Sequence, residues 1–278
     1  MRYSPWTKIL WSIAMSKEPF QPISVKSPTE HSWKFRLRCF LDLQLRTIAG
    51  PLKNQLSHFP KGKIIDIGAG ESPWRGWLPS NCAYTGIDVN NSNEFGMKQR
   101  GDILLYDGTT IPLASNTFDG SICIEVLEHA DDPNLLISEI SRILKPGAPL
   151  ILTTPWSARR HHIPHDYHRF TRERLYAILS KNGFENISIE DRGNEYCVIF
   201  NKTLILLITK IKTLSITNSL YTTPLILILA TYSIIFLTIS HLSLMATKTI
   251  DSENLDPLGY YCKAQKQSSS ETQKPWPS

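Results

Sequence analysis

The chain has 278 residues, enough for one large domain with additions and for a sizeable buried core. Its 30 lysines and arginines exceed its 25 aspartates and glutamates only slightly, so the charge balance does not require a nucleic-acid partner. Five scattered cysteines include no C-x-x-C pair, which argues against a zinc or redox centre and indicates reduced thiols in a cytoplasmic setting.

The chain before the first predicted strand falls into two parts. Residues 1–33 combine tryptophans with several prolines and lack a signal-peptide pattern, so we expect a loosely ordered arm. From about Lys34 to His58, apolar residues recur at helical spacing, with Gly50-Pro51 as the expected break. This segment is expected to cover the sheet ahead of its first strand.

The stretch 63–73 joins a short apolar run to a glycine-rich turn. Three isoleucines around Asp66 indicate a buried strand. Gly68 and Gly70 bracket the turn, where the lack of Cβ atoms lets the backbone approach a ligand closely. A dinucleotide fingerprint would need a third glycine where Pro73 stands, so that alternative is disfavoured.

Strand-like runs with acids near their carboxyl ends follow the turn. They are Ala83–Val89 with Asp88, Asp102–Tyr106 followed by Asp107, Ser121–Val126 with Glu125, and Pro149–Thr154. Asp88 lies eighteen residues after Gly70, close to the interval at which nucleotide sites place a ribose-binding carboxylate. Such a carboxylate can accept two hydrogen bonds from a vicinal diol, although a solvated loop acid is the alternative.

A helix is predicted between the last two of these strands. Asp132-Pro133 begins it and Lys145-Pro146-Gly147 ends it, with a stripe of leucines and isoleucines between them. A second helix is predicted over Arg172–Lys181, followed by a strand over Glu185–Asp191. The alternation of strands and helices predicts a doubly wound, mostly parallel α/β sheet.

The order of these motifs resembles the type 11 subgroup of class I S-adenosylmethionine-dependent methyltransferases. The likeness begins with D-x-G-x-G and continues from Asp107 through I-P-L, T-F-D, V-L-E-H, D-P, E-I-S-R-I-L-K-P-G and L-I-L-T-T-P, within about residues 60–192. Gly147-Ala148 replaces the usual Gly-Gly, which is a mild change. The resemblance implies a seven-stranded Rossmann-like sheet, S-adenosylmethionine as cofactor and methyl transfer to an acceptor.

The same resemblance implies roles for single residues. The methionine part of the cofactor would face Asp66, Gly68, Ala69 and Gly70. Asp88 would hold the ribose hydroxyls, Asp107 would lie beside the adenine amino group, and Glu125 would lie on the pocket edge. No (Asp/Asn)-Pro-Pro-(Tyr/Phe) follows the fourth strand, which argues against methylation of base amino groups and against a nucleic-acid substrate.

The segment 159–171 is rich in histidine and follows the fifth strand, where an acceptor would bind. Histidine is the usual general base near neutral pH, and His165 is our candidate, with His129 and His161 as alternates. A structural role is the competing interpretation, with Thr171 as a natural helix N-cap. We expect no metal, because the family generally needs none and no carboxylate cluster accompanies the histidines.

The composition changes abruptly after the sixth strand. No charged residue occurs from Thr213 to Thr247, and Leu225–Met245 is long enough to cross a bilayer. The preceding segment has apolar residues on one helical face and lysines elsewhere, as in an interfacial helix. Leu258–Gln265 resembles the last, antiparallel strand of the family.

These features predict a methyltransferase domain over residues 34–196 and 250–266, a hydrophobic hairpin insert over 197–249 and a disordered tail over 267–278. The hairpin, through residues 198–247, is expected to associate with the cytoplasmic side of a membrane without crossing it. The expected acceptor is a hydroxyl of a sugar, lipid or polyprenyl-linked molecule. A carbon of a quinone-type ring, or a binding module without catalysis, is the alternative.

Overall fold

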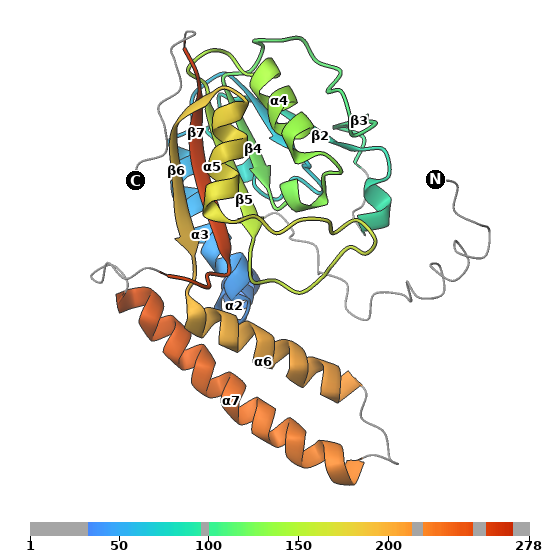
Figure 1. Ribbon diagram of the computed structural model, residues 1–278, viewed down its shortest axis with the longest axis vertical. Helices are drawn as coiled ribbons and strands as arrows, with labels where there is room; N and C mark the ends of the chain where they lie inside the picture. The colour runs from blue at the N-terminus through green and yellow to red at the C-terminus, as the bar shows by residue number, and fades with distance from the viewer. Residues whose placement is uncertain (1–32, 96–99, 213–218, 247–253, 269–278) are drawn as a thin grey trace, which may run out of the picture.

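The computed structural model describes residues 33–95, 100–212, 219–246 and 254–268. Within these ranges the chain forms a sheet with helices on both faces and a hairpin of two helices beyond one end of the sheet (Figure 1). Most of the predicted N-terminal arm and C-terminal tail lies outside the described residues; Trp33 already belongs to a helix.

One seven-stranded sheet forms the centre of the molecule. Its strands are β1 (Lys63–Ile67), β2 (Ala83–Val89), β3 (Ile103–Tyr106), β4 (Gly120–Ile124), β5 (Pro149–Pro155), β6 (Phe184–Arg192) and β7 (Gly259–Lys266). The spatial order is β3-β2-β1-β4-β5-β7-β6, and β7 runs antiparallel to both of its neighbours. The other neighbouring pairs are parallel. The predicted fold class and the predicted direction of the last strand are therefore confirmed.

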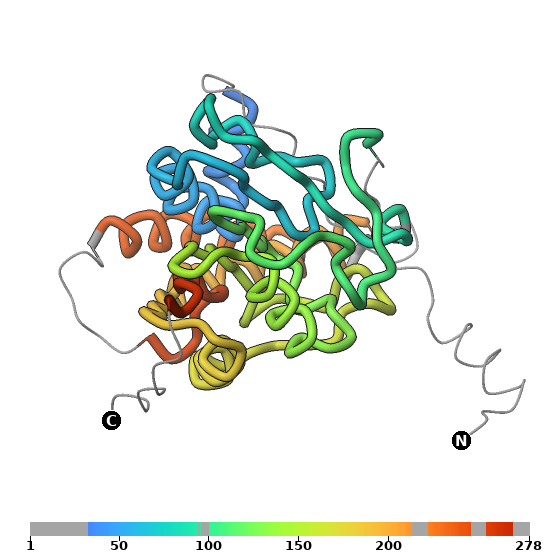
Figure 2. Tube along the Cα trace, turned by 90° about the horizontal axis from the view of Figure 1, so that it is seen from above, coloured from blue at the N-terminus to red at the C-terminus, as the bar shows by residue number. Residues whose placement is uncertain are grey.

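Helices cover both faces of this sheet. They are α2 (Trp33–Leu41), α3 (Leu43–Ser57), α4 (Pro133–Ile143) and α5 (Arg172–Lys181). Ile65 and Ile67 of β1 pack in the same core as α4 and α5, whereas Ile64 packs with α3. Figure 2 shows α3 in blue and α5 in yellow on opposite sides of the strands. Because successive strand residues face opposite sides, the isoleucine run fills two cores at once.

The caps of two helices agree with the sequence. Asp132 accepts hydrogen bonds from the amides of the first turn of α4, and Thr171 accepts one from Arg174 at the start of α5. Both side chains satisfy amide donors that a helix start leaves unpaired. The predicted bounds of α5 are confirmed at both ends.

The prediction of a helix break at Gly50-Pro51 is wrong. Pro51 lies inside α3, and the interruption falls at Asp42, between α2 and α3. Asp42 has an extended backbone, and its Oδ1 accepts a hydrogen bond from the Leu45 amide at 3.1 Å, which starts a new helix. Buried leucines on both sides of Pro51 keep α3 on the sheet, so tertiary packing outweighs the hydrogen bond that proline removes.

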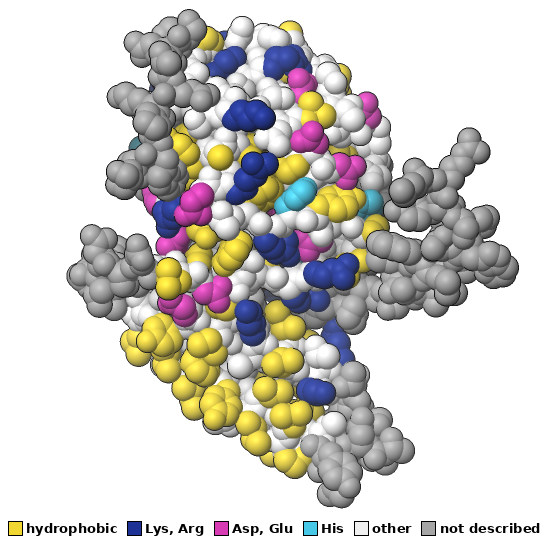
Figure 3. All heavy atoms as spheres, in the orientation of Figure 1, with side chains coloured by type: hydrophobic (Ala, Val, Ile, Leu, Met, Phe, Trp, Pro, Cys, Tyr) yellow, Lys and Arg dark blue, Asp and Glu magenta, His cyan; other side chains and the backbone are white. Residues whose placement is uncertain are grey.

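A hairpin of two helices, α6 (Glu195–Lys212) and α7 (Ser219–Ala246), joins β6 to β7. Its base packs on the domain, since Cys197, Val198 and Phe200 share a core with Leu43 and Leu258. Beyond this base, hydrophobic side chains gather along α7 on the surface (Figure 3). The predicted helical hairpin between the last two strands is therefore present.

Candidate active site

A cavity of about 410 Å³ lies at the carboxyl ends of the first four strands. Five of the predicted cofactor residues line it: Gly68 and Gly70 after β1, Asp88 near the end of β2, Asp107 after β3 and Glu125 after β4. In an open α/β sheet this edge is where ligands bind. The structure thus brings together residues that are up to 57 positions apart in the sequence, from Gly68 to Glu125.

The glycine turn is held in a shape that other residues could not adopt. Gly68 has a φ of +66°, and a Cβ atom there would lie 2.3 Å from a methyl group of Val126. Gly70 also has a positive φ, and its amide donates a hydrogen bond to Asp88 Oδ2 at 2.9 Å. The turn is therefore coupled directly to the carboxylate on the next strand.

Asp88 is a half-buried carboxylate whose orientation is fixed by backbone hydrogen bonds. Its Oδ1 accepts a hydrogen bond from the Val89 amide at 2.8 Å, in addition to the Gly70 contact on Oδ2. Burial raises the pKa of Asp88, while the two backbone hydrogen bonds lower it. Each carboxylate oxygen has a second lone pair, so Asp88 can still accept hydrogen bonds from a diol in the cavity.

Asp107 is exposed and preorganised in a different way. Its Oδ1 accepts hydrogen bonds from the amide and the hydroxyl of Thr109 at 2.8 and 2.7 Å. These bonds lower the pKa of Asp107, so its side chain is a carboxylate acceptor at neutral pH. An acceptor at this position suits the amino group that the sequence resemblance places there.

Glu125 occupies a strained position on the edge of the cavity. Its φ is +55°, a left-handed conformation that costs a non-glycine residue on the order of 1–3 kcal/mol. Its amide donates to the Thr153 carbonyl at 3.1 Å, and its Oε1 accepts a hydrogen bond from Arg192 Nη2 at 2.9 Å. The Arg192 side chain is 1% exposed, so this ion pair anchors Glu125 to a buried arginine.

Asp66 and Ala69 do not line the cavity. Asp66 is buried and accepts a hydrogen bond from the Tyr84 hydroxyl at 2.7 Å, and burial raises the pKa of Asp66 to about 7. The Ala69 amide donates to the Ile87 carbonyl at 3.0 Å. Both residues hold the glycine turn against β2. A direct contact of either with the cofactor stays a prediction.

Histidines form one wall of the cavity, with His129, His162 and His165 among its lining residues. His165 Nδ1 lies 3.0 Å from the Tyr167 hydroxyl, and the His165 carbonyl lies 2.7 Å from His129 Nδ1. Burial lowers the pKa of His129 to about 4, which leaves its ring neutral and weakly basic. His161, the other alternate base, lines a neighbouring cavity instead.

Three of these rings are close enough to hold a metal ion. One ring nitrogen from each of His129, His161 and His162 lies within 4.8 Å of the others. Glu128 is buried beside them, with its Oε1 3.6 Å from His129 Nε2 and 4.0 Å from His161 Nε2. Among the described residues, neither Glu128 oxygen has a hydrogen-bond partner. Imidazole and carboxylate ligands suit a divalent ion such as zinc.

The expectation of no metal rested partly on the lack of a carboxylate cluster beside the histidines. The structure places two carboxylates beside the rings, Glu128 and also Asp166, whose Oδ2 lies 3.4 Å from His161 Nδ1. Burial raises the pKa of Glu128 well above its usual range. The expectation of no metal itself stays a prediction.

Sequence reasoning missed several residues of the site. Phe95, Tyr106 and His162 line the cavity, and Arg192 supports Glu125. Phe95 lies in the short 3-10 helix Ser92–Phe95, which has no periodic pattern to mark it. His162 could have been found, since it belongs to the histidine-rich segment. Glu128 could have been found as the acid between the apolar pair Val126-Leu127 and His129.

The strand order and the ligand cavity at the carboxyl edge define a class I methyltransferase fold. A family model described as methyltransferase domain, type 11, matches residues 65–152. The chain therefore carries an S-adenosylmethionine-dependent methyltransferase domain of type 11, and S-adenosylmethionine is the cofactor of this domain.

Curated relatives match the same part of the chain. An O-methyltransferase of Pyrenophora dematioidea is 29% identical over 108 residues, which cover 35% of this chain and 40% of that protein. Cycloartenol-C-24-methyltransferase 1 of Oryza sativa subsp. japonica is 31% identical over 126 residues, 40% of this chain and 36% of that protein. The chain spans less than half the length of each of these relatives.

Among solved structures, a SAM-dependent methyltransferase from Archaeoglobus fulgidus is similar in fold. It is 17% identical, with a TM-score of 0.48, and the alignment covers 84% of this chain and 100% of that one.

Proposed function

We propose that this chain transfers a methyl group from S-adenosylmethionine to a hydroxyl oxygen of a sugar, lipid or polyprenyl-linked acceptor, at the cytoplasmic side of a membrane. One observation carries the proposal. The hairpin leaves the sheet after Arg192 and returns at Gly259, and these two residues pair with each other at the edge that bears the cofactor cavity. An acceptor held by a membrane would therefore reach the methyl donor from the hairpin side.

The chain's own residues supply binding and proton removal. Asp88 and Asp107 would hold the cofactor through its ribose and adenine, and Glu125 would border the methyl donor. When bound, the cofactor supplies an electrophilic methyl group on a sulfonium and leaves as a neutral thioether. If His165 Nδ1 donates its proton to the Tyr167 hydroxyl, Nε2 can accept the proton of the attacking hydroxyl.

The relatives support the chemistry only in general terms. The Pyrenophora protein is named an O-methyltransferase, which agrees with an oxygen acceptor, whereas the rice protein is named a cycloartenol-C-24-methyltransferase. Carbon methylation therefore remains the second candidate. The histidine wall favours oxygen, because a hydroxyl of ordinary acidity needs a base and the cavity offers an imidazole at its rim.

The proposed membrane association rests on α7 and on the sheet. Among the described residues one helix, over Thr222–Met245, is long and apolar enough to cross a membrane, and most of it is not buried against the domain. Because β7 pairs with β5 and β6, the chain must return to the side it left, which allows zero or two crossings. Helix α6 carries Lys202, Lys210 and Lys212, and charges at mid-bilayer are costly, so we favour a hairpin embedded in one leaflet.

Labelled S-adenosylmethionine tests the proposal directly. The full-length protein is incubated with membrane extract, and label is measured in lipid, glycan and quinone fractions. We expect transfer to an alkali-stable ether in the lipid or lipid-linked glycan fraction. His165→Ala should lower kcat by roughly 10²–10⁴ with unchanged affinity for S-adenosylhomocysteine, whereas His58→Ala, at the exposed end of α3, should leave kcat unchanged. Label on a ring carbon would establish the second candidate, and absence of turnover would favour a binding module.

A further inference from the structure

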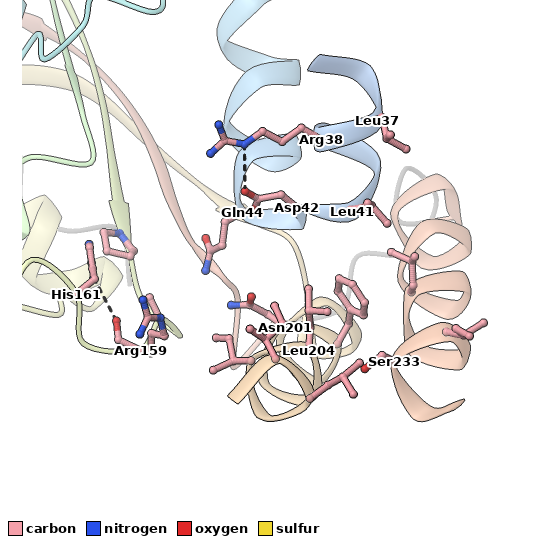
Figure 4. A pocket seen from close by; sticks show the side chains of 18 of the residues that line it. Leu37, Arg38, Leu41, Asp42, Gln44, Arg159, His161, Asn201, Leu204 and Ser233 are labelled. Atoms are coloured by element: carbon pink, nitrogen blue, oxygen red, sulfur yellow. Dashed lines mark hydrogen bonds and ion pairs between the residues drawn. The ribbon is translucent and has the colours of Figure 1, made fainter. Parts of the chain in front are cut away.

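A second and larger cavity, of about 960 Å³, lies between the domain and the hairpin (Figure 4). Its apolar wall comes from three helices: Leu37 and Leu41 of α2, Leu204 and Ile208 of α6, and Ile234 and Leu237 of α7. Glu125 and His161 also line it. Glu125 also lines the cofactor cavity, so the two cavities meet at this residue.

Polar atoms in this apolar wall have nothing to bind among the described residues. The side-chain nitrogen and oxygen of Gln44 and the hydroxyl of Ser233 are buried without a hydrogen-bond partner, and Ser233 is only 6% exposed. Figure 4 shows Gln44 pointing into the cavity on the side of Asn201. Unpaired buried polar atoms are rare and costly in native proteins, so a bound molecule with polar groups would satisfy them.

The polar end of the cavity is cationic. A neighbouring cavity of about 650 Å³ shares Arg159 and Asn201 with it and is also lined by Lys202 and by Arg169, which is already paired with Asp166 at 2.6 Å. Among the described residues, no acid lines that neighbouring cavity. The two acids of the larger cavity are already paired, Asp42 with Arg38 at 3.8 Å and Glu125 with Arg192 at 2.9 Å. Arginine and lysine at such a place suit a phosphate group.

We propose that the larger cavity binds the apolar chain of a phosphate lipid, whose phosphate lies at Arg159 and Lys202 and whose head reaches the cofactor cavity past Glu125. This inference rests on the proposed function, in which that lipid is the methyl acceptor. The cavity volume is near the upper end of the roughly 300–1,000 Å³ typical of small-molecule sites. The exposed apolar side of α7 would give the chain a path from a bilayer into the cavity.

Photolabelling with a dodecyl phosphate that carries a terminal diazirine tests where the chain binds. The full-length protein in phosphatidylcholine nanodiscs is irradiated without cofactor, and labelled peptides are located by mass spectrometry. We expect label on cavity residues of α2, α6 and α7. Ala230→Trp, which fills the cavity, should lower that label at least tenfold, and Leu227→Trp, which places the same side chain on the exposed side, should not. Ile208→Trp fills the cavity from α6 and guards against a folding defect in the first variant.

The contribution of the phosphate group to binding is tested by comparison with a neutral probe. Arg159→Glu should lower labelling by the dodecyl phosphate at least tenfold and leave labelling by the matching dodecanol unchanged. Equal loss with both probes, or cavity label that neither tryptophan variant reduces, would overturn the inference. Binding of S-adenosylhomocysteine is measured on every variant as the folding check. If photolabelling fails while methyl transfer to lipid persists, the proposed function stands and this site for the chain is wrong; the reverse outcome would leave a lipid site without methyl transfer.

Discussion

The cofactor edge of the sheet and the α6–α7 hairpin follow opposite rules of burial. At the sheet edge, charged side chains face a cavity, and apolar residues such as Ile67 and Ile87 lie inside. In α7 Ser233 and Ser240 are buried, with Ser240 0% exposed, while Leu227 and Met245 are 64% and 72% exposed. A sheet domain gains stability by removing apolar surface from water, whereas a helix that leaves large apolar side chains exposed is suited to an apolar medium. The difference supports the proposed association of the hairpin with a membrane.

The largest change in stability is expected in the sheet domain, from replacing the buried carboxylate of Asp66. Its pKa of about 7 lies above the ordinary value of 3.8, so the native state holds an extra proton between about pH 4 and 7. Stability should therefore fall as the pH rises through this window, and the full cost should be present above it. Asp66→Asn cannot ionise and should gain roughly 2–4 kcal/mol relative to the parent between pH 4 and pH 8.

Denaturant unfolding of both proteins across this pH range measures that difference. Burial also lowers the pKa of His129 and of His162 to about 4, so these rings raise stability as the pH rises from about 4 to 6.5. Their effect occurs in both proteins and cancels in the difference. A difference that does not change with pH would show that Asp66 titrates normally.

A substitution at Gly259 tests how tightly Arg192, the partner of Glu125, is packed against the sheet. A Cβ at this position would lie 2.4 Å from the Thr154 carbonyl oxygen and 2.3 Å from Arg192 Nη2. Since the carbonyl belongs to a central strand and cannot move away, Gly259→Ala should destabilise the protein by about 3 kcal/mol. It should also displace Arg192 and weaken cofactor binding, measured by calorimetry with S-adenosylhomocysteine. Unchanged unfolding free energy would mean that the edge is loosely packed.

Asp88 tests the cofactor cavity itself. Replacing it with alanine removes the acceptor proposed for the ribose diol and should cost about 1–3 kcal/mol of binding free energy for S-adenosylhomocysteine. The variant also frees the Gly70 amide, so thermal unfolding is measured alongside. Asp88→Asn keeps one oxygen acceptor and should lose less affinity than Asp88→Ala. Equal affinity of all three proteins would remove Asp88 from the site.

Gly50 gives the smallest effect, with the opposite sign from Gly259. It lies inside α3, and a Cβ there would meet nothing within 4 Å. Gly50→Ala should therefore stabilise the protein by roughly 0.5–1 kcal/mol, because alanine favours the helix. A loss of stability would indicate that the proline next to Gly50 leaves a local backbone geometry that alanine does not fit.

The sequence predicted the elements better than the contacts of their side chains. The bounds of β2 and α5 follow from local patterns of apolar residues and caps, and the structure confirms them. The contact between Asp66 and Tyr84 depends on the pairing of β1 with β2, which no local pattern specifies. The approach of Glu128 to His161 joins two loops 33 residues apart and could not be read from either loop.

The hairpin shows the same limit. Its length and apolar composition were evident from the sequence, and so was its place between the last two strands. The pattern of apolar residues in α7, however, does not indicate which side of this helix contacts the domain. His241 decides this, since its Nε2 lies 2.9 Å from the Phe40 carbonyl oxygen and its ring stacks on Phe40. These contacts involve residues about 200 positions apart, beyond any local rule.

Vesicle flotation tests most directly whether the hairpin is built for a membrane. Full-length protein is floated with vesicles that contain anionic phospholipid, at low and high salt, beside a double variant with Leu227→Glu and Ile228→Glu on the exposed side of α7. Leu104→Glu, on an exposed leucine of β3, is the matched control. We expect the parent and the control to float at both salt concentrations and the double variant to float at least about 10-fold less, because charges at bilayer depth are costly. All three should bind S-adenosylhomocysteine equally. A parent protein that stays in the aqueous fraction, or a double variant that floats as well as the parent, would contradict a membrane role for the hairpin.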